Sequence, residues 1–220
     1  IENDKRKKKR SSNNLIKPFY EFVFRHSIFK ISLIFIFIFS FKFGDVIAGV
    51  MANPFYVKLG FSNIEIANAS KIFGVVMTIL GVFIGGVLVR KVGVISALIL
   101  SGFFQVVSNL LYILLNHVGP EIYFLFLVVA GENFSGGMGS AAFVAYLSAL
   151  CNKNYTGTQY ALLSSIMGLA RTVLSSPSGF IVESFGWTKF FIFSIFLGVP
   201  ALFILFWMKK NFSLKMQKSN

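Results

Sequence analysis

Five ionisable side chains lie inside long apolar runs of this 220-residue sequence: Lys42, Asp45, Lys71, Glu132 and Arg171. Placing a charge in the middle of a bilayer costs about 2.5–3.5 kcal/mol or more on insertion scales, so such residues usually serve a function. With a helical rise of ~1.5 Å per residue, three of the five are expected near the membrane midplane, namely Lys42, Glu132 and Arg171.

These residue types suggest two kinds of chemistry. Lysine and arginine can hold the carboxylates of a solute, and arginine can do so with two parallel hydrogen bonds. We therefore predict Lys42, Lys71 and Arg171 as substrate ligands. A carboxylate near a cation that is exposed alternately to each side of a membrane can carry a proton. Asp45 follows Lys42 by one helical turn on nearly the same face, so it is the first candidate for proton coupling, and Glu132 is the second.

An alternative role for these charges is mutual neutralisation in buried ion pairs that only fix the packing of the helices. Three cations against two anions would leave one positive charge without a partner. The group as a whole is better explained by a water-filled cavity that accepts an anionic solute.

The composition indicates a lipid bilayer as the main solvent. The chain is 55% hydrophobic and 13% charged and contains 28 Phe, whereas a soluble domain carries about 25% charged residues. A net charge of +13 suggests nucleic acid at first, but nine of the 21 Lys and Arg lie in residues 1–30 and four in residues 208–220. No folded basic platform accompanies them, so we expect no nucleic-acid partner.

The predicted fold class is an all-α membrane protein with six transmembrane helices. A span needs about 20 residues, so six spans with short loops fit the length. We predict a basic tail or linker over residues 1–30, a bundle over 31–208 and a second basic tail over 209–220. The six predicted spans are Ile31–Asn53, Ile64–Val89, Val94–Leu115, Ile122–Leu150, Thr158–Val182 and Lys189–Met208.

The basic residues also predict the orientation. The two tails and the even-numbered loops hold 16 Lys and Arg, and the odd-numbered loops hold two. Because cytoplasmic loops carry the excess of positive charge, both termini are predicted to be cytoplasmic.

Polar and small residues predict how the spans pack. The third span has a polar stripe at helical spacing, which favours hydrogen bonds between helices: Ser101, Gln105, Ser108, Asn109 and Tyr112. The second and fourth spans have close-packing faces of small residues, Gly81 with Gly85 and Gly131 with Ser135 and Gly139. Pro177 is expected to kink the fifth span.

The motifs of common enzyme classes are missing from the sequence. Cys151 is the one cysteine, which excludes an intrachain disulfide and a Cys-x-x-Cys metal site. There is no nucleophile elbow, phosphate-binding loop or His-Glu-x-x-His motif. We therefore expect no catalytic residues, no metal site and no cofactor.

Several segments together resemble the AmpG muropeptide permeases of the major facilitator superfamily. They are Lys42–Asp45, Gly85–Arg90, Gly131–Ala145, Leu150–Lys153, Thr158–Ser164 and Val182–Trp187. The segment in the fourth span is the most specific of these. The resemblance implies one of the two six-helix bundles of that fold, the C-terminal one, with the basic tail as part of the central linker. Asn133, the neighbour of Glu132 in this segment, is a further predicted substrate ligand.

The family resemblance also implies a function. AmpG permeases import anhydro-muropeptides across the bacterial inner membrane, driven by protons, for peptidoglycan recycling. The expected partners are thus an anionic sugar-peptide substrate, the lipid bilayer and an N-terminal six-helix half. Two other interpretations remain open at this stage: an inactive relic of a split transporter gene, and a membrane scaffold that transports nothing.

Overall fold

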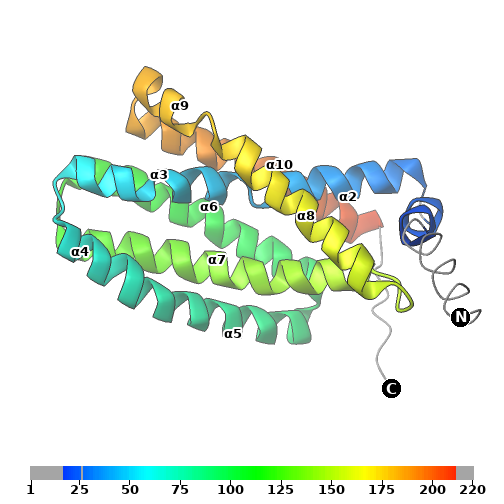
Figure 1. The fold of residues 1–220 in the computed structure, drawn as a ribbon. Coiled ribbons are helices and arrows are strands. Elements are labelled where there is room, and N and C mark those ends of the chain that lie inside the picture. The colour runs from blue at the N-terminus through cyan, green and yellow to red at the C-terminus, as the bar shows by residue number, and fades with distance from the viewer. Residues whose placement is uncertain (1–16, 26, 212–220) are drawn as a thin grey trace, which may run out of the picture.

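The computed structural model describes residues 17–25 and 27–211, so the basic run from Lys5 to Arg10 lies outside the described residues. The described part is helical, without a strand (Figure 1). Residues 17–25 form a short helix at the N-terminal end. The elements that follow are α2 (Ile28–Phe41), α3 (Phe43–Leu59), α4 (Asn63–Ala67), the π-helix η1 (Asn68–Phe73), α5 (Gly74–Val92), α6 (Val94–Val118), α7 (Ile122–Leu150), α8 (Thr156–Ser175), α9 (Ser178–Phe185) and α10 (Trp187–Asn211).

Five helical stretches among the described residues are long and apolar enough to cross a membrane. They are Ile28–Leu59, Asn63–Val92, Val94–Val118, Ile122–Leu150 and Trp187–Asn211. They overlap five of the predicted spans, and the predicted count of six is not confirmed. The predicted span Thr158–Val182 falls on α8 and α9. Its helix is interrupted around Pro177, between Ser175 and Ser178, and α8 carries many polar side chains.

The first span is divided at Lys42. This residue ends α2 and precedes α3 with φ −102° and ψ 1°, outside the helical range. Two residues later, a Cβ on Gly44 would collide with the backbone carbonyl of Ser194 on α10. The break and the close approach together set the direction in which the side chains around Lys42 point.

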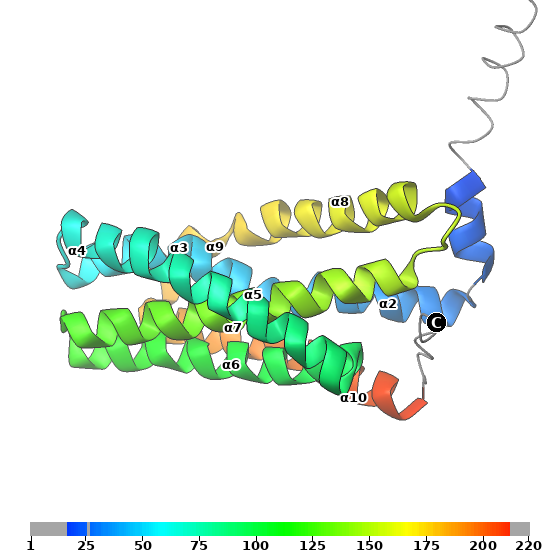
Figure 2. The same cartoon turned by 90° about the horizontal axis from the view of Figure 1, so that it is seen from below.

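Small residues let α7 approach helices on two of its sides. A Cβ on Gly81 of α5 would collide with the Phe134 carbonyl, and a Cβ on Gly137 would collide with the Thr78 carbonyl. On the other side of α7, a Cβ on Gly131 would lie 2.8 Å from Leu111 of α6. Figure 2 shows α7 running beside both α5 and α6. The predicted close-packing faces are thus confirmed.

Aromatic side chains fill much of the interior. Phe55 of α3, Tyr112 of α6 and Phe191 of α10 are fully buried and pack against one another. The Tyr112 and Phe191 rings stack with their centroids 4.6 Å apart. Offset stacks and edge-to-face pairs of this kind are worth about 0.5–1.5 kcal/mol beyond the area they bury. This cluster fixes α6 against α3 and α10, and thereby holds the polar side chains of α6 in place.

Candidate functional site

A cavity of about 260 Å³ lies between α2, α3, α7 and α8. Its described wall includes the aromatic residues Phe39, Phe43 and Phe143, the thioether of Met167, and Ser140. Its charged groups among the described residues are two cations, Lys42 and Arg171, and no described carboxylate lines it. Apolar walls with a few placed polar groups are typical of ligand sites. The two cations of the described wall are complementary in charge to an anion.

Lys42 is anchored to α7. Its Nζ donates to the Gly136 carbonyl at 3.1 Å and to Ser140 Oγ at 2.8 Å. Ser140 in turn donates to the same Gly136 carbonyl at 2.7 Å. A lysine ammonium has three N–H donors, so one remains for a solute in the cavity. The contact of Lys42 with Ser140 was not predicted from the sequence.

Arg171 reaches the cavity from α8, on the far side from α7. Its side chain is exposed, and its charge lies close enough to Lys42 to interact with it, although less strongly than the charge of Asp45 does. Two like charges on one cavity repel each other, and an anion between them would relieve that repulsion. Lys42 and Arg171 therefore line one space, and their role as substrate ligands stays a prediction.

Asp45 faces a different space from Lys42. It lines a small cavity between α3, α6 and α10, together with Gln105 and Asn109. Their spacing in the sequence predicts Asp45 and Lys42 on nearly one helix face. That expectation assumed an unbroken helix, but the break at Lys42 turns the two side chains toward separate cavities.

Glu132 lies where α3, α6 and α7 meet. Its carboxylate accepts a hydrogen bond from the Tyr112 hydroxyl, which itself accepts one from Tyr56 at 3.5 Å. A Cβ on Gly49 would lie 3.1 Å from Glu132 Oε1, so α3 leaves just enough room for the carboxylate. Glu132 is thus held by a hydroxyl from the polar stripe and does not line the larger cavity.

Asn133 and Lys71 lie away from the larger cavity. Asn133 Oδ1 accepts from Thr78 Oγ1 at 3.0 Å, and its Nδ2 donates to the Val129 carbonyl at 2.9 Å. Its amide therefore joins α7 to α5. Lys71 is exposed on the π-helical turn η1. None of the five ionisable residues named at the outset makes an ion pair within 4 Å with another described residue. The described residues thus show no direct ion pair among the five, but the charges of Lys42 and Asp45 lie close enough to interact.

The polar stripe of α6 points inward, and all five of its residues are buried. Ser108 Oγ lies 3.2 Å from Ser135 Oγ on α7, and Tyr112 bonds Glu132 on the same helix. The predicted hydrogen bonds between helices are confirmed for these two members. Ser101 instead donates to the Leu98 carbonyl on its own helix.

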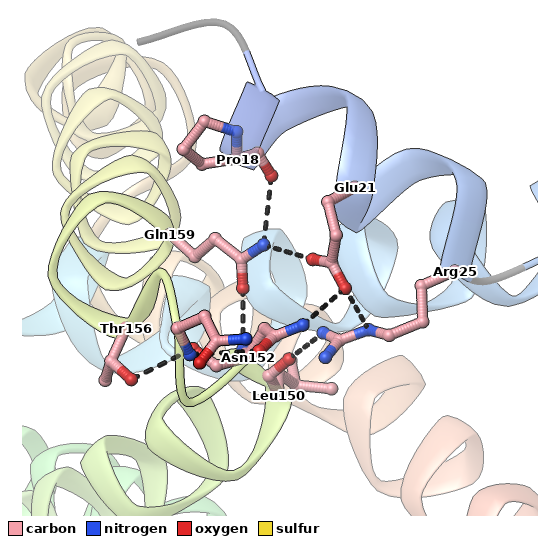
Figure 3. Close-up of polar contacts among 8 residues, drawn as sticks. Pro18, Glu21, Arg25, Leu150, Asn152, Thr156 and Gln159 are labelled. Atoms are coloured by element: carbon pink, nitrogen blue, oxygen red, sulfur yellow. Dashed lines mark hydrogen bonds and ion pairs between the residues drawn. The ribbon is translucent and has the colours of Figure 1, made fainter. Parts of the chain in front are cut away.

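A second polar cluster lies at the turn between α7 and α8 (Figure 3). Gln159 Nε2 donates to the Pro18 carbonyl at 2.9 Å and to Glu21 Oε2 at 2.6 Å, while its Oε1 accepts from the Asn152 backbone at 2.7 Å. Asn152 Nδ2 donates to Glu21 Oε1 at 2.7 Å. Arg25 forms an ion pair with Glu21 at 3.7 Å and donates to the Leu150 carbonyl.

This cluster docks the helix of residues 17–25 onto the bundle. Phe22 from that helix is 1% exposed and belongs to the main apolar core. The predicted basic tail over residues 1–30 does not include this contact. Gln159 and Glu21 lie far apart in the sequence, so sequence patterns give no direct indication of their contact. The available hint is that Glu21 is an acidic residue among mostly basic ones.

No protein-family model matches the chain. Individual proteins do match: over 197 residues the chain is 42% identical to AmpG 4 of Rickettsia felis, which is named provisionally as a transporter. The chain is a relative of the AmpG transporters. It is also 40% identical over 196 residues to AmpG 4 of Rickettsia conorii, and 35% identical over 192 residues to the anhydromuropeptide permease of Escherichia coli.

These matches cover most of this chain and a smaller part of each AmpG relative. The matches to the Rickettsia felis, Rickettsia conorii and Escherichia coli proteins cover 90%, 89% and 87% of this chain. They cover 47%, 47% and 38% of those relatives, in the same order. The chain thus spans about half the length of the two Rickettsia proteins and less of the Escherichia coli permease. The resemblance drawn from the sequence motifs is confirmed by these identities.

Proposed function

We propose that this chain forms one substrate-binding wall of a proton-coupled transporter that imports an anionic sugar-peptide of the anhydro-muropeptide class. The observation that carries the proposal is the cavity between α2, α3, α7 and α8, on which Lys42 and Arg171 are the charged groups of the described wall. The name of the Escherichia coli relative supplies the substrate class. The proposed location is the bacterial inner membrane, with both termini in the cytoplasm.

The cavity suits the chemistry of such a substrate. Muropeptides carry several carboxylates, and the free donor of Lys42 together with the guanidinium of Arg171 offers two cationic contacts. Aromatic rings such as Phe39 and Phe143 offer flat apolar surface for a sugar ring or a peptide side chain. Lys71 and Asn133 remain proposed ligands of lower rank, because neither lines this cavity.

Asp45 and Glu132 are the proposed proton-coupling residues. Both lie within spans and neither lines the larger cavity, but the Asp45 charge lies close enough to Lys42 to interact with it, so a solute bound at Lys42 can act on Asp45. Glu132 has a hydroxyl donor in Tyr112, which stabilises its charged form. A carboxylate held by one adjustable donor can gain and lose a proton as that donor turns toward or away from it.

A second six-helix half is the proposed partner. The chain matches about half of its Rickettsia relatives, which supports a role as one half of such a transporter, and we assign it to the C-terminal half. The partner half would complete the cavity, whether it is joined to this chain or supplied separately. If no partner restores transport, the chain is an inactive relic or a scaffold.

Uptake of labelled anhydro-muropeptide into permease-deficient cells tests the proposal. The chain is expressed with the N-terminal half of an AmpG relative, and membrane insertion of both is verified. We expect uptake above the empty-vector level, with large losses for Lys42→Gln and Arg171→Gln. Lys91→Gln, which changes an exposed cation at the end of α5, serves as the matched control. Absence of uptake with both halves inserted would reject transport.

A further inference from the structure

An open groove of about 440 Å³ runs along the surface where α6 packs against α10. Among the described residues, its polar wall groups are Lys209 and Ser96. The rest of the described wall is apolar: Val92, Ile99, Leu100, Phe103, Leu202 and Phe206. Phe103 and Phe206 are more than half exposed. A hollow with apolar walls and a few polar groups is typical of a ligand site.

The polar and apolar groups of the groove are separated along its length. Ser96 lies in the first turn of α6 and Lys209 in the last turn of α10, at the end of the bundle where α5 leads into α6 (Figure 2). Phe103 follows Ser96 by seven residues, and Leu202 precedes Lys209 by seven, which corresponds to about 10 Å of helix. Because the hydrocarbon of one leaflet is about 15 Å thick, the groove extends across much of one leaflet.

Cations gather at the polar end of the groove. The last turn of α5 contains Arg90 and Lys91, and the last turn of α10 contains Lys209 and Lys210. None of the three helices α5, α6 and α10 contains an Asp or Glu. A lysine at a membrane surface lays its stem on apolar groups and keeps its ammonium at the headgroups. Basic residues there attract anionic lipids, so this end is complementary in charge to a lipid phosphate.

The groove lies on the opposite side of the bundle from the larger cavity. Figure 2 shows α8 on one side and α6 with α10 on the other. No described residue of α6 or α10 lines the larger cavity. The groove is therefore outside the space that a second half would complete, and its surroundings in a membrane are lipid.

We propose that this groove binds one anionic phospholipid. An acyl chain lies along Leu100, Phe103 and Phe206, and the phosphate lies at Lys209, with the Ser96 hydroxyl as a further donor to the headgroup. A second copy of the chain is a poorer occupant, because a symmetric dimer in a membrane would bring two cationic ends of like charge together. The inference goes beyond the proposed transport function and does not depend on it.

Thermal melting of the solubilised full chain with added lipid tests the charge of the headgroup. Phosphatidylglycerol and phosphatidylcholine with the same acyl chains are compared, so the two additions differ only in the headgroup. Because a ligand that binds the folded state raises its thermal midpoint, phosphatidylglycerol should raise the midpoint more. Lys209→Gln should remove most of that difference, and Lys209→Arg should retain it. Equal midpoints of the wild type in the two lipids would overturn the proposal.

Lys153→Gln is the matched control for loss of one cation. Lys153 is exposed in the turn between α7 and α8, at the same end of the bundle, and does not line the groove. This variant should keep the wild-type preference for phosphatidylglycerol. An equal loss of preference in Lys153→Gln and Lys209→Gln would show general attraction to a basic surface and overturn the site.

Leu100→Trp tests whether the acyl chain occupies the groove. Leu100 is 39% exposed on the groove wall, so an indole at this position fills part of the groove and leaves every charge in place. Leu110→Trp, at a position of α6 that is 50% exposed and does not line the groove, is the control. We expect the preference for phosphatidylglycerol to be lost in Leu100→Trp alone. A wild-type preference in Leu100→Trp would refute the groove as the binding site.

Native mass spectrometry identifies the occupant. The wild type should retain one phosphatidylglycerol per chain, several-fold more often than Lys209→Gln or Leu100→Trp does. A dimer that carries no lipid and is lost in Leu100→Trp would replace the lipid with a second copy of the chain.

Discussion

Gln159 and Glu21 lie far apart in the chain but only 2.6 Å apart in the structure, where the Gln159 amide donates to the Glu21 carboxylate. Gln159 is 1% exposed, and it bonds at the same time to the turn that joins α7 to α8. The contact therefore fastens the helix of residues 17–25 to one end of the bundle. Cys151 lies in that turn, between the Leu150 carbonyl that accepts from Arg25 and the Asn152 amide that donates to Glu21.

Gln159→Leu should release this helix and expose Cys151. Leucine keeps the bulk but makes none of the three hydrogen bonds of the glutamine, so docking loses its central polar contacts. We expect alkylation of Cys151 by a maleimide to become several-fold faster. Ser165→Ala, at an exposed position further along α8, is the matched control and should leave the rate unchanged. Equal rates for Gln159→Leu and the wild type would show that the docking does not depend on Gln159.

The pH dependence of the same reaction gives a separate prediction. Burial raises the pKa of the Cys151 thiol above its usual value, and the nearby Arg25 charge lowers it by a smaller amount. Because the thiolate is the reactive form, the wild-type rate should rise at higher pH than that of an exposed thiol. Release of the helix removes both influences, and since burial is the larger, the curve for Gln159→Leu should shift to lower pH. A shift to higher pH would mean that Arg25 is the stronger influence.

Tyr112→Phe should damage both stability and coupling. It removes the hydroxyl that donates to Glu132 and leaves the Tyr56 hydroxyl without its acceptor. Loss of one hydrogen bond to a buried carboxylate costs roughly 1–3 kcal/mol. We expect a lower thermal midpoint and reduced proton-driven uptake in the two-half transport assay. Tyr123→Phe, at a position that is 84% exposed at the start of α7, should change neither.

Asp45→Asn should abolish proton-driven accumulation while leaving membrane insertion intact. Asparagine keeps the shape and polarity of the side chain but cannot take up and release a proton. Exchange of substrate down its gradient should persist, because Asp45 does not line the larger cavity. Glu183→Gln on α9 is the control for loss of one exposed carboxylate. Accumulation against a gradient by Asp45→Asn would remove this residue from the coupling role.

Gly81→Ala should weaken the contact between α5 and α7. The added methyl group would collide with the backbone carbonyl of Phe134, which cannot move without shifting α7. Overpacking of this kind costs about 1–3 kcal/mol. Gly86→Ala, five residues further along α5 with nothing within 4 Å of the added Cβ, should be tolerated. Similar thermal midpoints for the two variants would mean that the helices do not pack this closely in the membrane.

The sequence was most informative where a rule acts within one helix. The helical spacing of the α6 stripe predicted that residues such as Gln105 and Ser108 would face other helices, and they are buried. The spacing of Gly81 and Gly85 predicted a close helix contact in the same way. These predictions succeed because 3.6-residue periodicity decides which side chains share a face, whatever the partner helix is.

The sixth predicted span shows the limit of such local rules. The segment Thr158–Val182 has the length of a span, but its helix is interrupted around Pro177 and α8 presents polar groups, including Gln159 and Arg171. Length and average hydropathy do not report where those polar groups point. Arg171 faces the larger cavity, while Gln159 faces the helix of residues 17–25.

By itself, the sequence determined the helical class, the small-residue contacts and the presence of costly charges within apolar helices. Only the tertiary structure decided which charges share a space. Lys42 and Arg171 come from distant helices and line one cavity, whereas Asp45, three residues from Lys42, faces another. The reason is physical: the helix breaks at Lys42, and α7 and α10 pack against the two sides of that break. Periodicity within one segment carries no information about either contact.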